Sequence, residues 1–297
     1  MPTTQQVPDS DMPQLFQAAD QASLAAQRSY VRGTQLRLGL LVTAAATGVV
    51  SWRVGSGQID VLALIGVAAF MLALLVEGSL WRNRPDKAWY DGRAVAESAK
   101  TLAWKYAVGG LPFPTLMAVP DATSKLIDRL EGVRNQFHDL ELEALDAPAI
   151  SDWMTQQRLS PLDERKQTYL DARVRDQRSW YSKKAIFNKK RSKQWRIALV
   201  ALEFAGAASS LVAAFTQSPI LIPPAIAAIA GAVVAWLETK QHDGLSRAYS
   251  AAVADLASAE TKLLLTNSES SWATEVDDTE EAISREHVVW LATRSRI

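Results

Sequence analysis

The sequence has no cysteine, and its charges balance, with 32 lysines and arginines against 32 aspartates and glutamates. Without cysteine the chain has no disulfide, no thiolate nucleophile and no cysteine-ligated metal, although the redox compartment stays open. Zero net charge gives no long-range attraction to nucleic acid, so we expect no nucleic-acid partner.

Residue patterns that carry catalysis are also scarce. The three histidines, His138, His242 and His287, lie far apart, with no His-x-x-x-His pair and no acidic cluster at metal-ligand spacing. The sequence has no Walker phosphate-binding loop, and Gly55-Ser56-Gly57 lies in a turn that follows no strand. We therefore expect no enzyme, no cofactor and no bound metal.

Four apolar runs interrupt an otherwise polar chain, at residues 38–52, 61–76, 197–216 and 220–237. Each pair is joined by a short turn, VGSGQID or QSP, which predicts two antiparallel helical hairpins. The first two uncharged runs are shorter than the ~20 residues that span a bilayer, but flanking arginines can reach the interface. We expect four membrane crossings. The alternative is a soluble helical bundle with alanine-rich core helices.

Aromatic and basic residues favour the membrane interpretation. Tryptophans stand at the ends of the runs, at Trp52, Trp81, Trp195 and Trp236, where an interfacial belt would lie. Arginines and lysines flank the outer ends of both hairpins, whereas the two turns carry only Arg53. By the positive-inside rule, both termini and the long middle region are cytoplasmic. The chain opens with a polar stretch, so we expect no cleaved signal peptide.

The two hairpins belong to an internal repeat. QRSY at Gln27 recurs as QRSW at Gln177, and each copy precedes a basic stretch, a hairpin and an alanine-rich polar helix. Two crossings per unit keep the same orientation, so the repeats are parallel. The predicted organisation is an amphipathic cytoplasmic helix in 1–36, a hairpin in 37–82, a cytoplasmic helical region in 83–176, a juxtamembrane helix and second hairpin in 177–238, and cytoplasmic helices in 239–297.

The cytoplasmic part is predicted to be helical, with no strand. Ser160-Pro161-Leu162-Asp163 indicates the start of a long helix that leads to the third crossing, with proline at its first position. Gly109-Gly110 ends a helix that begins near Lys87. A last amphipathic helix over about 271–295 places Val276, Ile283 and Trp290 seven residues apart, which suggests a helix–helix seam.

The segment after the first hairpin resembles the SLATT family, the two-transmembrane effector domains that associate with SMODS nucleotide synthases and SLOG sensors. The matching residues are Trp89, Tyr90, Arg93, Glu97-Ser98, Lys100-Thr101, Trp104, Tyr106 and Pro112-Phe113. The second unit resembles the family in layout, with Tyr249 and Glu260-Thr261-Lys262 as a weaker match. The resemblance implies a bacterial inner-membrane effector that forms pores when a nucleotide-sensing defence system is triggered. The chain departs from the simplest members because it has two hairpins.

Polar residues inside the crossings are the candidate pore lining. Glu203 is the one charged residue within the third run, and it shares a helix face with Ala207, Ser210 and Gln217. The first run carries a similar stripe of small polar residues that includes Thr43, Thr47 and Ser51, which can line water or serve as a packing seam. Glu203 can alternatively reach towards Arg196 or the headgroups.

Three further groups flank the crossings. Glu77 and Glu238 close the hairpins and either form a carboxylate ring at the inner mouth or mark the interface. Trp89, Tyr90, Arg93, Glu97, Thr101 and Trp104 are candidates for subunit contact or coupling, with an ordinary Arg93–Glu97 ion pair as the alternative. A basic cluster is predicted to touch anionic lipid, with a ligand phosphate as the alternative partner; it comprises Lys183, Lys184, Lys189, Lys190, Arg191, Lys193 and Arg196.

Together these features predict an all-α membrane protein with two parallel-repeat hairpins whose long helices extend into a cytoplasmic helical domain. One chain has too few helices to enclose a water path, so we expect a homo-oligomer. The predicted function is an ion channel or pore-forming effector, gated from the cytoplasmic side by a nucleotide or protein trigger. The alternatives are a non-conducting membrane scaffold and a nucleotide-binding regulator without a pore.

Overall fold

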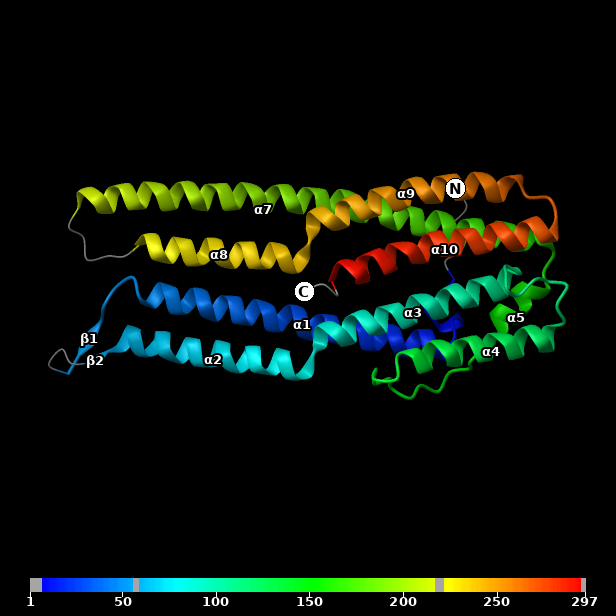
Figure 1. The fold of residues 1–297 in the computed structure, drawn as a ribbon, viewed down its shortest axis with the longest axis horizontal. Helices are drawn as coiled ribbons and strands as arrows, with labels where there is room; N and C mark the ends of the chain where they lie inside the picture. Colours follow the sequence, from blue (N-terminus) through cyan, green and yellow to red (C-terminus); the bar gives the residue numbers. More distant parts are fainter. Residues whose placement is uncertain (1–6, 56–58, 217–221, 295–297) are drawn as a thin grey trace. The chain divides into compact units, whose positions relative to one another are not determined.

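The structure, a computed structural model, describes residues 7–55, 59–216 and 222–294, and it is almost entirely helical in these ranges (Figure 1). The elements are the short 3-10 helix η1 (Asp9–Asp11), α1 (Gln14–Thr47), β1 (Arg53–Val54), β2 (Ile59–Asp60), α2 (Val61–Asn83), α3 (Pro85–Val108), α4 (Val119–Gln136), α5 (Asp152–Leu159), α6 (Leu162–Tyr169), the π-helical turn η2 (Leu170–Arg175), α7 (Asp176–Phe215), α8 (Ile222–Lys240), α9 (His242–Leu265) and α10 (Glu269–Arg294).

The chain divides into two units, and each takes residues from both halves of the sequence. Unit 1 comprises Met1–Ala26, Asp86–Ala185 and Arg247–Ile297, and unit 2 comprises Gln27–Pro85 and Ile186–Ser246. Unit 2 therefore contains the four predicted crossings, and unit 1 contains most of the predicted cytoplasmic helices.

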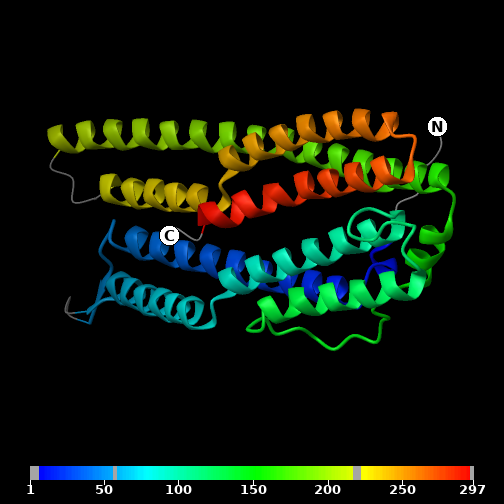
Figure 2. The same cartoon turned by 45° about the vertical axis from the view of Figure 1, so that its right-hand side comes forward.

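In unit 2, α1 and α2 form the first hairpin and α7 and α8 form the second (Figure 2). Small residues hold the first pair together. A β-carbon added at Gly33 would lie 2.7 Å from Cδ2 of Leu80, and one added at Gly66 would lie 2.7 Å from Oγ1 of Thr47. These two contacts, at opposite ends of the pair, show antiparallel helices whose backbones approach closely because the glycines lack side chains.

The turn between α1 and α2 differs from the all-helical prediction. Arg53 pairs with Asp60 and Val54 with Ile59 in a two-residue antiparallel ladder. Asp60 is also the N-cap of α2, where its Oδ1 accepts hydrogen bonds from the amides of Leu62 (3.1 Å) and Ala63 (3.2 Å). A side chain that caps the helix and a short ladder together fix the tight reversal.

In the part of the chain that the structure describes, three helices are long and apolar enough to cross a membrane, in the ranges Val61–Val108, Leu162–Phe215 and Ile222–Leu265. The first predicted crossing is not among them. Within the described residues α1 ends at Thr47, and its earlier turns carry the polar residues that precede Leu38, so its apolar part is short. Length and composition thus support three of the four predicted crossings.

Each hairpin ends at a left-handed residue that is not glycine. Arg84 has φ +43° and separates α2 from α3, and Gln241 has φ +49° and separates α8 from α9. In both cases the amide donates back to a leucine carbonyl, to Leu80 at 3.0 Å and to Leu237 at 2.8 Å. The repeat seen in the sequence is therefore also a repeat of backbone geometry.

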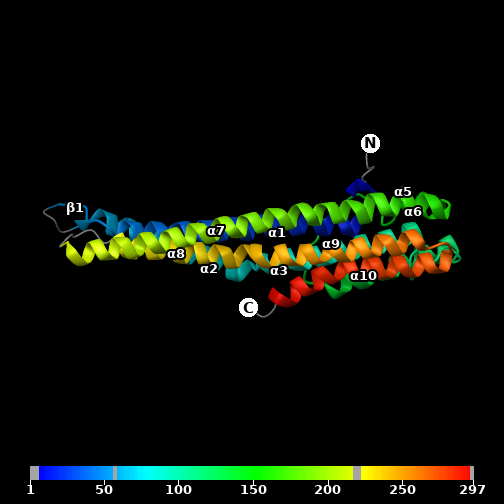
Figure 3. The ribbon, with the colours of Figure 1, turned by 90° about the horizontal axis from the view of Figure 1, so that it is seen from above.

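The core of unit 1 is aromatic. Tyr169 lies between Trp104 and Trp272, with ring centroids 5.8 Å from each, and all three side chains are buried. The helix that starts at Leu162 continues through the π-helical turn into α7, as Figure 3 shows. This confirms the predicted long helix, although its N-cap is Pro161, which makes no side-chain capping bond.

The predicted helix ends in unit 1 are close to those observed. Helix α3 stops at Val108, and Gly109 has φ +78°, a conformation that glycine adopts without strain. Val276 and Ile283 are buried on α10, as the seven-residue spacing predicts, while the side chain of Trp290 lies outside the described part of the structure.

Candidate functional site

Glu203 lies on α7 with its side chain exposed on an apolar surface. The neighbouring Val200 is 63% and Phe204 76% exposed, and Ala207 and Ser210 on the same stripe are exposed as well. The hydroxyl of Ser210 donates to the carbonyl of Gly206 at 2.8 Å, so its hydrogen bond stays within the helix. Gln217, the last member of the predicted stripe, lies outside the described residues.

The seam between α7 and α8 runs beside this stripe. A β-carbon added at Gly206 would lie 3.4 Å from Cγ2 of Ile226, so Gly206 faces α8. Arg196, which the sequence offers as a partner for Glu203, instead pairs with Asp243 at 3.5 Å. Within the described ranges Glu203 makes no ion pair or hydrogen bond with another side chain. A carboxylate in such a setting needs water or another chain as its partner.

The polar stripe of α1 is satisfied locally. Thr43 donates to the carbonyl of Gly39 at 2.9 Å, and Thr47 donates to that of Ala44 at 2.8 Å. Thr43 is exposed, whereas Thr47 packs against Gly66 in the α1–α2 seam. Ser51 donates to the carboxylate of Asp60 in the turn. Of the three, Thr43 remains available to line a surface.

The two carboxylates at the hairpin exits occupy different positions. Glu77 pairs with Arg37 at 2.8 Å, with both side chains about half exposed, while Glu238 is exposed. Measured from the left-handed breaks, Glu77 lies two turns before Arg84 and Glu238 about one turn before Gln241. The two are therefore not equivalent in the repeat, and the charge of Glu77 is balanced within the chain.

The coupling candidates on α3 divide into half-buried and buried residues. The carbonyl of Trp89 accepts a hydrogen bond from Ser23 at 3.1 Å, and the Trp89 ring stacks on Tyr90. Arg93 lies 3.8 Å from Glu97, a long contact for an ion pair. Further along the same face, Thr101 and Trp104 are buried within unit 1, so in this chain that end of the face contacts the protein's own core.

A buried ionic cluster, which the sequence analysis did not find, lies beside Thr101. Arg173 donates to both oxygens of Glu280, from Nε at 2.9 Å and from Nη2 at 2.8 Å. Tyr169 donates to the same carboxylate at 3.0 Å, and Thr101 at 2.9 Å. Glu280 is fully buried, so its charge is met by four hydrogen bonds instead of water.

The electrostatics of this cluster follow from burial and from the carboxylate. Burial by itself would lower the pKa of Arg173, but the charge and hydrogen bonds of Glu280 outweigh it and hold that pKa above its usual value. Burial, and then the charge of Glu280, hold the pKa of Tyr169 well above its usual value, so the phenol keeps the proton that it donates. Arg173 lies in the π-helical turn, a feature common at functional sites.

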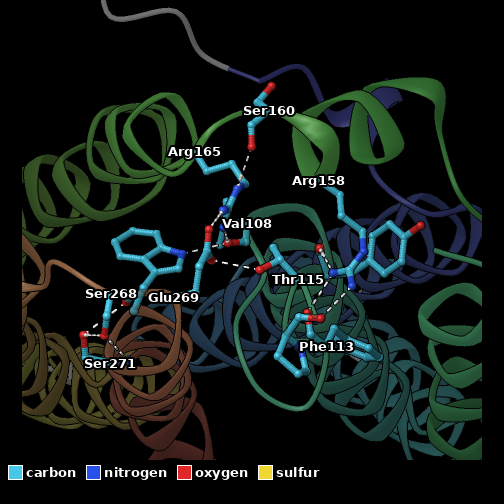
Figure 4. A network of polar contacts seen from close by, with 12 residues as sticks. Val108, Phe113, Thr115, Arg158, Ser160, Arg165, Ser268, Glu269 and Ser271 are labelled. Atoms are coloured by element: carbon cyan, nitrogen blue, oxygen red, sulfur yellow. Dashed lines mark hydrogen bonds and ion pairs between the residues drawn. The ribbon is translucent and has the colours of Figure 1, made fainter. Parts of the chain in front are cut away.

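A second polar network fastens the end of α3 to α10 (Figure 4). Arg165 donates to the carbonyls of Val108 (2.7 Å) and Ser160 (2.9 Å) and pairs with Glu269. Trp272 donates to the same Val108 carbonyl at 2.7 Å. Nearby, Arg158 donates to one backbone carbonyl in the last turn of α3, that of Tyr106, and to three between α3 and α4, those of Phe113, Pro114 and Met117.

The predicted basic cluster lies on consecutive turns of α7, and all its members are exposed. Two of them contact aromatic rings. Lys184 Nζ lies 5.5 Å from the ring centroid of Trp180, and Arg191 Cζ lies 5.4 Å from that of Phe187. The described residues contain no group of three or more histidine, aspartate or glutamate side chains placed to hold a metal ion.

The family comparison matches nearly the whole chain in two adjacent segments. Residues 13–166 match the model described as SMODS and SLOG-associating 2TM effector domain 3, and residues 169–290 match the model for effector domain 1 of the same name. Neither a curated protein nor a solved structure matches the chain. The first match covers half of the sequence, and both contain one helical hairpin. The chain therefore belongs to the SLATT family of two-transmembrane effector domains, of which it holds two in tandem.

Proposed function

We propose that this protein is a homo-oligomeric ion channel or pore-forming effector of a bacterial inner membrane, gated from the cytoplasmic side. The observation that carries the proposal is Glu203, an exposed carboxylate with no partner side chain in the described structure, on a helix otherwise suited to lipid. The family's description as a two-transmembrane effector domain agrees with this function.

The energetic argument concerns where Glu203 can point. A charged side chain at the centre of a crossing costs about 2.5–3.5 kcal/mol even on the mildest insertion scales. Facing lipid, Glu203 would incur part of this cost with no compensating contact. Facing a water path shared by several copies, it would remain hydrated, with Ala207 and Ser210 as small neighbours that leave room for water.

Assembly is needed because the crossings are uncovered in a single chain. None of the most apolar part of the Leu162–Phe215 helix or of the Ile222–Leu265 helix is buried. Lipid can cover part of this surface, but only further copies can enclose a path. Cyclic assembly of identical chains is the usual solution for such a protein.

Gating is proposed to act through the helix that carries Glu203. That helix begins at Leu162 in unit 1, passes through the π-helical turn held by Glu280, and continues to Phe215. A nucleotide or protein trigger that binds the cytoplasmic helices with different affinity in two arrangements would shift the population between closed and open states.

The test is conductance of the purified protein in planar bilayers, compared between wild type, Glu203→Gln and Asp128→Asn. Asp128 is an exposed carboxylate of α4 in unit 1 and serves as the matched control. We expect wild-type conductance with cation preference, a reduced preference in Glu203→Gln, and no change in Asp128→Asn. Bilayers that stay silent while vesicles remain impermeable, with nucleotides added, would instead favour the non-conducting scaffold.

A further inference from the structure

The cations of α7 change character along the helix. Just before it, at the end of the π-helical turn, Arg175 lies 2.6 Å from Glu260 and 2.5 Å from Asp171, and in its first turn Arg178 also pairs with Glu260. The turns that follow carry exposed cations that lie within ion-pair distance of no carboxylate in the described structure, namely Lys183, Lys189, Lys190, Arg191 and Lys193. Arg175 and Arg178 are therefore paired with carboxylates, whereas the five cations that follow have no ion pair in the described structure.

Apolar side chains are exposed among these cations. Ile186 is 68% and Phe187 49% exposed, and Ile197, where the apolar run begins, is 60% exposed. The guanidinium of Arg191 lies over the Phe187 ring in a cation–π contact. Such a contact suits a side chain that lies between polar and apolar surroundings. Exposed apolar residues interleaved with lysine and arginine are typical of a helix surface that enters the headgroup layer.

A further cation joins this surface from the end of the second hairpin. Lys240 Nζ lies 4.9 Å from the ring centroid of Trp236. Next to it, His242 Nδ1 lies 2.7 Å from Oδ1 of Asn188 on α7. Burial, and then the positive charges of Lys240 and Arg191, lower the pKa of His242. The carboxylate of the adjacent Asp243 pairs with Arg196.

We propose that this surface, residues 183–193 of α7 together with Lys240, binds the phosphate groups of anionic phospholipids beside the second hairpin. The unpaired positive charge needs an anionic counterpart, and the surface directly precedes a helix apolar enough to cross a membrane. The cations are spread over three turns and line neither of two cavities in the described part of unit 1, one between α9 and α10 and one beside α4. An extended surface suits several headgroups better than one enclosed small ligand.

The experiment measures which lipids the intact protein retains. Wild-type protein is reconstituted in nanodiscs of phosphatidylcholine with one part in five of phosphatidylglycerol, and the bound lipids are counted after detergent exchange. Lys189→Gln/Lys190→Gln/Lys193→Gln removes three unpaired charges. Lys125→Gln/Arg129→Gln/Arg134→Gln on α4 removes three charges elsewhere.

We expect wild type and the α4 variant to enrich phosphatidylglycerol over its share in the nanodisc. Each cation near a membrane surface raises the affinity for anionic lipid about fivefold, so the α7 variant should lose on the order of 100-fold in that affinity and no longer enrich phosphatidylglycerol. Raising the salt concentration of wild type from 0.1 M to 1 M should remove the enrichment too, and this measurement needs no variant.

Three results would overturn the proposal: retention of phosphatidylglycerol by wild type only in proportion to its share in the nanodisc, unchanged enrichment in the α7 variant, or displacement of the lipid by millimolar inorganic phosphate. The last would assign the surface to a free phosphate ligand. None of these measurements requires ion conduction, so the inference can fail while the channel proposal stands, and the reverse also holds.

Discussion

The buried pair of Arg173 and Glu280 gives the sharpest prediction of stability. Replacing Glu280 by glutamine keeps the shape of the side chain and removes its charge. The guanidinium of Arg173, 2% exposed, would then be buried without the carboxylate that it pairs with. Tyr169 and Thr101 donate to different oxygens of the carboxylate, so one of them would keep an amide oxygen as acceptor and the other would face an NH2 group that cannot accept its hydrogen bond.

The expected magnitude follows from this loss of charge balance. Breaking a buried ion pair by removing one partner typically costs about 3–5 kcal/mol, most of it from the charge left behind. At about 2 °C per kcal/mol for a domain of this size, the unfolding temperature should fall by roughly 6–10 °C. Removing both charges with Arg173→Met/Glu280→Leu should cost less than the single change, because no unpaired charge remains.

The assay is thermal unfolding of the detergent-solubilised protein, followed by circular dichroism. Asp139→Asn is the control because Asp139 forms an exposed ion pair with Lys87 at 3.0 Å. Surface pairs of this kind contribute little, so we expect no resolvable change. A Glu280→Gln protein as stable as Asp139→Asn, or a double variant less stable than the single one, would refute the reasoning.

Three further predictions concern backbone and titration. Gly92→Ala should lower the unfolding temperature, since the added β-carbon would lie 3.0 Å from the amide nitrogen of Ser23. Gly132→Ala, with open space around the added β-carbon, should raise the free energy of unfolding by about 0.5–1 kcal/mol. Gln241→Val should be less stable than Gln241→Gly by about 1–2 kcal/mol, because valine resists a positive φ. Burial, and then the charge of Asp9, raise the pKa of Asp20 in the folded state, so its ionisation opposes folding as pH rises above the usual value of 3.8. Asp20→Asn should therefore stabilise the folded protein at pH 7 and lose that advantage near pH 3. Thermal scans at both pH values check the last prediction.

The helices were largely predictable because their signals are local. Gly109 ends α3 where the sequence indicates, and the apolar runs after Val61, Ile197 and Ile220 supply the three helices suited to a membrane. The end of the first helix was less predictable, because apolar composition continues past Thr47 while the helix does not. Composition alone does not show where a helix gives way to a turn.

The ionic cluster was harder to predict because its members are far apart in sequence. Thr101, Arg173 and Glu280 come from three elements, and only the fold brings them together. One signal was present. Glu280 lies four residues after Val276 and three before Ile283, on the face that the seven-residue spacing marks as buried. A charged residue on a buried face requires a partner, and the sequence does not say which one.

The fusion of two hairpins in one polypeptide sets a rule for any larger structure made from it. An assembly of a given number of chains contains twice that number of hairpins, half of each of two kinds that are similar but not identical. Only the second kind carries Glu203. When the two hairpins are aligned on their left-handed residues, Arg84 and Gln241, the corresponding turn of the first hairpin lies near the alanines around Ala46. A ring of such chains would carry Glu203 on half of its hairpins. A ring of single-hairpin relatives with the same residue and the same number of hairpins would carry twice as many acidic groups.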